Sequence, residues 1–143
     1  MFNPNVVLKS VVEKASVQAI VSLFARAFLA YLFIVSGWGK IAGYDATVGY
    51  MQAMGVSGSL LPLVILLELG GGLAILFGLQ AHVVGLSLGV FSLLTAFLFH
   101  AAPEDALNFM KNIGLAGGFF YIMLYGAGKI SLDHLLEAKK VSH

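Results

Sequence analysis

The chain has no cysteine and very little charge. Its 143 residues include eight Lys or Arg and seven Asp or Glu, so only 10% of them are charged, against about 25% in a typical soluble domain. The absence of cysteine excludes disulfides, thiolate catalysis, Cys-ligated zinc and cysteinyl iron–sulfur clusters. A net charge of +1 gives no electrostatic reason to expect nucleic acid as a partner.

One long segment lacks charge altogether. No Asp, Glu, Lys or Arg occurs between Leu69 and Pro103, and 59% of the whole chain is apolar. A soluble domain of this length has too much surface to leave so little of it charged. The composition therefore predicts an integral membrane protein, with the lipid bilayer as its surroundings.

Four apolar segments are long enough to cross a bilayer, which takes about 20 residues per helix. They are residues Val17–Gly37, Leu60–Leu79, Val83–His100 and Ile113–Gly128. Only three residues, 80–82, separate the second segment from the third, so these two are expected to be antiparallel neighbours. The predicted fold class is all-α, a bundle of four transmembrane helices.

The segments between and before the spans carry helix signals of their own. Asp45–Met54 and Pro103–Met110 are each expected to hold a short helix, with Asp45 as an N-cap and Pro103 at a first helical position. Before the first span, Val7, Leu8, Val11 and Val12 share one helical face, which predicts an interfacial helix. The expected divisions are an N-terminal segment 1–16, a membrane domain 17–132 and a C-terminal tail 133–143.

The distribution of basic residues predicts the orientation. One side of the membrane would carry five lysines and the other two, and the side with more Lys and Arg is normally cytoplasmic. Both termini are therefore expected in the cytoplasm. The five are Lys9, Lys14, Lys129, Lys139 and Lys140, and the two are Lys40 and Lys111.

Two charged residues lie inside the predicted spans. Arg26 is about 14 Å from the cytoplasmic end of its span and Glu68 about 16 Å, at 1.5 Å per residue. Either charge alone would cost about 3 kcal/mol at the helix centre, so we expect Arg26 and Glu68 to form a buried ion pair. The pair has two interpretations, a fixed structural contact or a ligand, proton or ion site.

A second polar group gathers at the opposite boundary of the membrane. Trp38 and Lys40 close the first span, His100 closes the third, and Lys111 and Asn112 open the fourth. Each residue type is ordinary at a membrane interface. Together they are also candidates for a binding site with positive charge and a stacking indole, suited to an anionic or quinone-like head group. His82, His100, His134 and His143 do not come together in this layout, so no metal site is expected.

Four motifs resemble the DoxX family of small four-span bacterial membrane proteins. The arginine in the first span, the glutamate before a glycine-rich second span, the histidine closing the third and Lys-Asn opening the fourth follow that family's pattern. The resemblance covers residues 26–132 and implies that the membrane is the inner membrane of a bacterium. The motifs are SGWGKIAGY at 36–44, LLELGGGLAILFGL at 66–79, LTAFLFH at 94–100 and FMKNIGLAGG at 109–118.

The resemblance implies a link to redox chemistry, because relatives act as membrane subunits of quinone-linked oxidoreductases. It implies a chain that anchors an oxidoreductase partner, soluble or membrane-bound, or that handles a quinone, with no cofactor bound covalently. Without cysteine, any thiol or sulfane-sulfur chemistry would take place on that partner, so the chain is expected not to be a self-sufficient enzyme. The alternatives are a small transporter around Arg26 and Glu68, which would require a homo-oligomer, and a purely structural membrane partner.

Overall fold

The structure is a computed structural model that describes residues 1–142, and throughout this part of the chain the regular structure is helical, without strands. The predicted all-α class is confirmed. Three helical segments are long and apolar enough to cross a membrane, namely 15–42, 58–77 and 81–99. The fourth expected span is a helix of 20 residues, about 30 Å long at 1.5 Å per residue.

The chain begins with α1 (Pro4–Val12), whose first turn is capped by the side chain of Asn3, and continues into the long α2 (Ala15–Ala42). A short α3 (Tyr44–Ala53) follows. The second membrane segment is built from η1 (Gly58–Leu60), α4 (Leu61–Ile65), the π-helical η2 (Leu66–Gly70) and α5 (Gly71–Phe77). The remaining elements are α6 (Ala81–Phe99), η3 (Pro103–Asp105), α7 (Ala106–Tyr125) and α8 (Leu132–Val141).

Helix boundaries differ from the sequence prediction at two places. The expected short helix 103–110 is not separate, because the 3₁₀ turn η3 leads directly into α7, which then runs unbroken to Tyr125. No proline lies between Asp105 and Gly126, whose φ of 76° ends α7. Asp45 is not the N-cap of α3, which begins one residue earlier after Gly43; it lies in the first turn instead.

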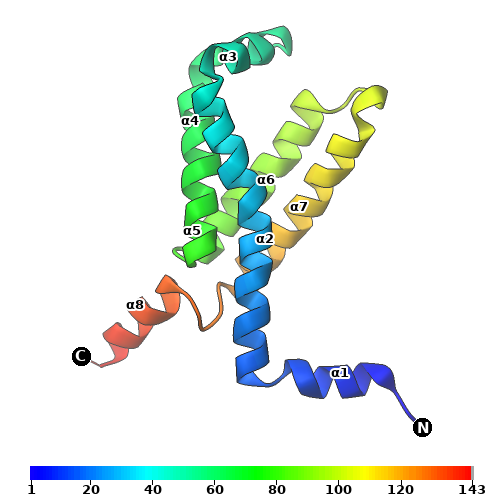
Figure 1. The fold of residues 1–143 in the computed structure, drawn as a ribbon, viewed down its shortest axis with the longest axis vertical. Coiled ribbons are helices and arrows are strands. Elements are labelled where there is room, and N and C mark those ends of the chain that lie inside the picture. Colours follow the sequence, from blue (N-terminus) through cyan, green and yellow to red (C-terminus); the bar gives the residue numbers. More distant parts are fainter. Residues whose placement is uncertain (143) are drawn as a thin grey trace.

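The membrane-spanning helices form two pairs (Figure 1). α2 packs along α4, η2 and α5, and α6 packs along α7. Gly85 allows the second pair to approach closely, because a Cβ at that position would lie 2.8 Å from the carbonyl oxygen of Phe119 and 2.9 Å from the amide nitrogen of Met123. Small residues at helix contacts are a main source of tight packing between membrane helices.

A buried cluster joins the two pairs. Phe33 of α2 meets Phe119 of α7 edge to face, with 5.1 Å between ring centroids, and Ala30, Ile75 and Leu88 are buried in the same cluster. The end of the bundle where α5 finishes and α6 starts is the closed end. At the opposite, open end, α2 and α4 diverge from α6 and α7 (Figure 1).

Candidate functional site

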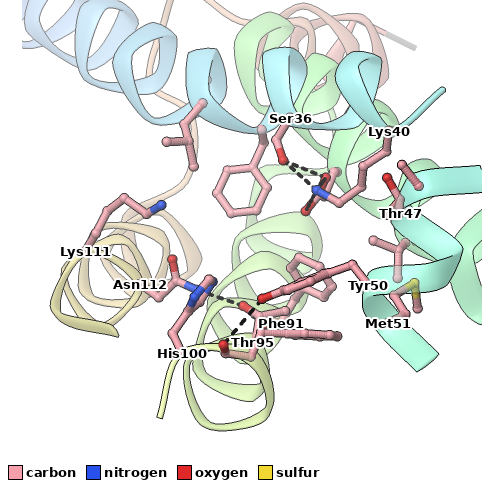
Figure 2. Close-up of a pocket in the computed structure, with 16 residues that line it drawn as sticks. Ser36, Lys40, Thr47, Tyr50, Met51, Phe91, Thr95, His100, Lys111 and Asn112 are labelled. Atoms are coloured by element: carbon pink, nitrogen blue, oxygen red, sulfur yellow. Dashed lines mark hydrogen bonds and ion pairs between the residues drawn. The ribbon is translucent and has the colours of Figure 1, made fainter. Parts of the chain in front are cut away.

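A cavity of about 490 Å³ lies between the two helix pairs at the open end (Figure 2). This polar cavity receives side chains from α2, α3, α4, η2, α6 and α7 and from the loop that follows α6. Four of the five residues predicted for a binding site line it: Lys40, His100, Lys111 and Asn112. Its other polar lining residues are Ser36, Thr47, Tyr50, Glu68 and Thr95.

Glu68 forms an ion pair with Lys40 inside the polar cavity. The Nζ of Lys40 lies 2.9 Å from Oε2 and 3.2 Å from Oε1 of the carboxylate. Ser36 completes the group, since its hydroxyl donates to Glu68 Oε2 at 3.1 Å and accepts from Lys40 Nζ at 2.7 Å. The Glu68 side chain is 8% exposed and that of Lys40 is 26% exposed, so the pair forms a polar point in an apolar bundle.

Two local features place the Glu68 carboxylate there. Glu68 lies in η2, one turn of π-helix inside an otherwise α-helical segment, and such turns are frequent at functional sites. Gly37 of α2 faces the same turn, and a Cβ at Gly37 would lie 2.8 Å from the backbone nitrogen of Leu69. The absence of a side chain at Gly37 therefore lets η2 approach α2 closely. Gly37 is next to Ser36 and one helical turn before Lys40, so Glu68 comes within reach of both side chains.

The predicted pair of Arg26 with Glu68 is wrong. Arg26 is buried near the closed end, where its guanidinium donates to three backbone carbonyls. The distances to the oxygens of Ile75 and Leu76 are 3.1 and 3.0 Å, and the third acceptor is the carbonyl of Ile130. Arg26 thus fixes the end of α5 and the segment before α8, rather than pairing with Glu68.

Depth along each apolar segment does not give a common depth in the bundle. α2 extends beyond the end of α5 at the closed end (Figure 1), so equal distances from the two segment ends do not correspond to equal depths. Arg26 is level with Ile75 and Leu76, which are seven and eight residues from Glu68, or about 11 Å along the helix. Glu68 is instead level with Ser36 and Lys40.

His100 reaches the edge of the polar cavity and pairs with Asp105. The ring Nδ1 of His100 lies 2.5 Å from Asp105 Oδ2, and the amide of Asn108 donates to the other carboxylate oxygen. The hydrogen bond from His100, followed by the one from Asn108, lowers the pKa of Asp105 below its ordinary value of 3.8. These contacts hold the α6–α7 loop against the start of α7.

Lys111 and Asn112 are not at the start of the fourth helix, as predicted, but in its second turn. Asn112 is 8% exposed and donates from Nδ2 to the hydroxyl of Thr95 on α6 at 2.9 Å. Lys111 is exposed and donates to the side-chain oxygen of Asn108 at 3.1 Å. Asn112 is therefore a fixed wall of the polar cavity, and Lys111 lies at its mouth.

Trp38 does not belong to the polar cavity. Its side chain is 66% exposed and is not part of the lining, because it is two residues from Ser36 and so on the opposite face of α2. The aromatic walls come from residues that the sequence prediction missed. Tyr50 stacks on Phe99 with 5.6 Å between centroids, and Phe33 and Phe91 line the same space.

The charges around the polar cavity are close to balanced. Lys40 is neutralised by Glu68, and His100 faces Asp105, so Lys111 is the one further basic side chain in the lining. The cavity thus offers both hydrogen-bond donors and a carboxylate acceptor beside aromatic rings. Within residues 1–142, no group of three or more His, Asp or Glu side chains could hold a metal ion.

Comparison with known proteins agrees with this architecture. The chain is 52% identical over 120 residues to the inner membrane protein YqjF of Escherichia coli K12, covering 82% of this chain and 92% of the relative. It is 31% identical over 121 residues to the inner membrane protein YphA of the same organism, covering 78% and 86%. No solved structure matches. The DoxX family profile matches residues 21–101, and this multi-pass membrane protein belongs to the DoxX family.

Proposed function

We propose that this chain is a membrane subunit that binds the head group of a quinone in the polar cavity and serves an oxidoreductase partner. The observation that carries the proposal is the Lys40–Glu68 pair, 2.9 Å apart, within an aromatic-lined cavity. A quinone presents carbonyl acceptors and a quinol presents hydroxyl donors. Lys40 can donate to the first and Glu68 can accept from the second, so the pair suits both forms.

The charge balance favours a neutral head group over an anion. An anion in the polar cavity would lie beside the Glu68 carboxylate, whose one close cation, Lys40, is already engaged. Flat rings stack on aromatic side chains, and Tyr50, Phe91 and Phe99 supply such surfaces in the lining. Of the two head groups expected from the sequence, the quinone therefore fits this cavity better than a small anion.

The oxidoreductase partner follows from chemistry that this chain lacks. With no cysteine in the sequence, thiol and sulfane-sulfur transfer belong to another protein, which would deliver electrons to the bound quinone. The chain would position the quinone ring between a donor, the Nζ of Lys40, and an acceptor, the carboxylate of Glu68. This role corresponds to the redox association that the family resemblance implies.

The alternative of a small transporter loses its main support. It depended on Arg26 and Glu68 facing each other at mid-membrane, and Arg26 instead contacts carbonyls near the closed end. Transport through four spans would also require a homo-oligomer. A purely structural role in a membrane complex remains the competing outcome of the test below.

Orientation is part of the proposal. We infer that the chain lies in the bacterial inner membrane, the location named for both relatives. We also infer that both termini are in the cytoplasm, because the five-to-two lysine distribution favours that orientation. α1 and α8 both lie toward the closed end (Figure 1), so the polar cavity would open toward the periplasm. A reporter that is active in the cytoplasm should be active when fused to the C-terminus, and one that is active in the periplasm should be inactive there. Activity of the periplasmic reporter would contradict this orientation.

Ligand-induced thermal shift tests the binding proposal. Quinones added to the purified protein in detergent should raise its melting temperature, because a ligand at about a hundred times its Kd stabilises the folded state by about 2.7 kcal/mol. Thiosulfate and other small sulfur oxyanions should give little shift. Lys111→Gln and His100→Ala should reduce the quinone-induced shift.

The control is Lys14→Gln, which lies between α1 and α2, far from the polar cavity, and should leave the shift intact. Lys111→Gln and Lys14→Gln should change melting without ligand little, since exposed charges contribute little to stability. His100→Ala also removes the contact with Asp105, so its quinone-induced shift is measured from its own ligand-free melting temperature. If no quinone stabilises the wild type, the head-group site fails and the structural role takes its place.

A further inference from the structure

An apolar groove of about 510 Å³ lies on the side of the bundle between α4–η2 and α6. Its walls open to the bilayer, since Leu63 and Leu94 on opposite sides of it are 60% and 55% exposed. Other lining residues include Leu60, Leu67, Leu86 and Val90. Its size is within the range of small-molecule sites, about 300–1,000 Å³.

The groove offers an occupant almost no hydrogen bonding. Its lining contains two hydroxyl groups, on Ser87 and Thr95. Ser87 donates to the carbonyl of Val83 at 2.9 Å, and Thr95 donates to the carbonyl of Phe91 at 3.0 Å. Both hydroxyls are thus used within α6, and the groove presents an apolar surface suited to a hydrocarbon chain.

The groove adjoins the polar cavity. Five residues line both spaces. The turn η2 contributes the charged Glu68 to the polar cavity and the apolar Leu67 to the groove. Along α6 the groove runs from Phe99 to Leu86, about 20 Å at 1.5 Å per residue. A molecule occupying both would place a polar head at the membrane boundary and a chain toward the bilayer centre. The shared residues are Met51, Val64, Phe91, Thr95 and Phe99.

We infer that the groove binds the prenyl tail of the quinone, and that the quinone enters the polar cavity sideways from the bilayer. This inference rests on the proposed function, which concerns the head group alone. A prenylated quinone is too apolar to cross water, so a site with a lateral opening to lipid is reached without leaving the membrane. The passage would run between α4 and α6, past Phe91 and Phe99.

Charge argues for a quinone in this combined site rather than for a phospholipid. The phosphodiester of a phospholipid would bring its negative charge to the polar cavity, where Glu68 already neutralises Lys40. Lys111 would be its one remaining partner, and that side chain is exposed at the mouth. A neutral ring with a single apolar tail meets no such repulsion.

The test compares two quinones that differ only in the tail. Decylubiquinone and its tailless parent, dimethoxymethylbenzoquinone, are titrated into the purified full-length protein by calorimetry. Wild type should bind decylubiquinone about tenfold or more tightly, because each buried methylene group adds to affinity. Val90→Trp should remove this tenfold advantage by filling the groove, and should leave the tailless quinone unaffected.

Val83→Trp is the matched control, since Val83 is on the same helix, is 61% exposed and lies outside both linings. Leu94→Trp, in the next turn after Val90, is a second groove variant, and the melting temperatures of all three variants show that each is folded. If folded Val90→Trp and Leu94→Trp bind decylubiquinone as Val83→Trp does, the groove proposal is wrong and the head-group site stands. If wild type binds neither quinone, both proposals fail.

Discussion

At the scale of single residues, Lys40 and Glu68 decide the character of the site. Removing one member of a partly buried pair leaves the other without its partner, so Glu68→Gln and Lys40→Met should each lower the free energy of unfolding. Because Lys40 is 26% exposed, solvent screens part of this effect. The double variant should recover part of the loss, with a coupling of about 1–2 kcal/mol.

The control for this cycle is Arg26→Met combined with Glu68→Gln. Arg26 and Glu68 share no partner, so their effects should add within about 0.5 kcal/mol. Thermal unfolding in detergent of the single and double variants measures both couplings. Coupling between Arg26 and Glu68 with none between Lys40 and Glu68 would contradict the arrangement described here.

The same residues show what the sequence could predict and what it could not. The residue types of the site were identifiable, because charge and histidine are rare in this chain and four of the five candidates line one cavity. The sequence did not indicate which of these residues pair with each other. The sequence predicts Lys40 as a boundary lysine, although Ser36 lies four residues earlier on the same helical face and shares its contact with Glu68. That spacing was the available signal.

At the scale of helices, the approach of η2 to α2 depends on Gly37. A Cβ at Gly37 would lie 2.8 Å from the backbone nitrogen of Leu69, whereas a Cβ at Gly39 would have no neighbour within 4 Å. Gly37→Ala should therefore cost about 1–3 kcal/mol through overpacking and should weaken quinone binding by moving Glu68. Gly39→Ala should leave stability unchanged or raise it by up to about 1 kcal/mol.

Unfolding and quinone titration of these two variants are the measurements. Equal behaviour of Gly37→Ala and Gly39→Ala would show that close packing of η2 on α2 does not position Glu68. The comparison is well matched because both glycines lie within α2, two residues apart.

The positions of the helices could be predicted from the sequence, but the π-helical turn and the extent of α7 could not. Apolar segments reflect the thickness of the bilayer, so the four spans could be located from composition. The π-helical turn at Glu68 arises where η2 meets α2, and no local pattern in LLELG indicates it. The sequence pattern predicts a short helix at 103–110 and a separate span from Ile113, because Lys111 and Asn112 suit the membrane boundary, whereas α7 is one unbroken helix from Ala106.

At the scale of the whole molecule, the two helix pairs form a bundle that is closed at one end and open at the other. Arg26 joins α5 to the segment before α8 at the closed end, through the carbonyls of Ile75, Leu76 and Ile130. Asp133 adds to this end by accepting from the backbone nitrogens of Gln80 and Ala81 at 2.7 and 2.8 Å. These contacts connect the helices at the closed end, and the polar cavity and the groove lie toward the open end.

Photoaffinity labelling tests the central claim, that the polar cavity holds a quinone, most directly. An azidoquinone is irradiated with the protein in lipid vesicles, and the labelled residues are identified by mass spectrometry. We expect labels on lining residues such as Tyr50, Phe99 and His100, and we expect excess decylubiquinone to suppress them. Labels spread over exposed positions outside the cavity such as Phe28 and Trp38, and unchanged by the competitor, would contradict the account.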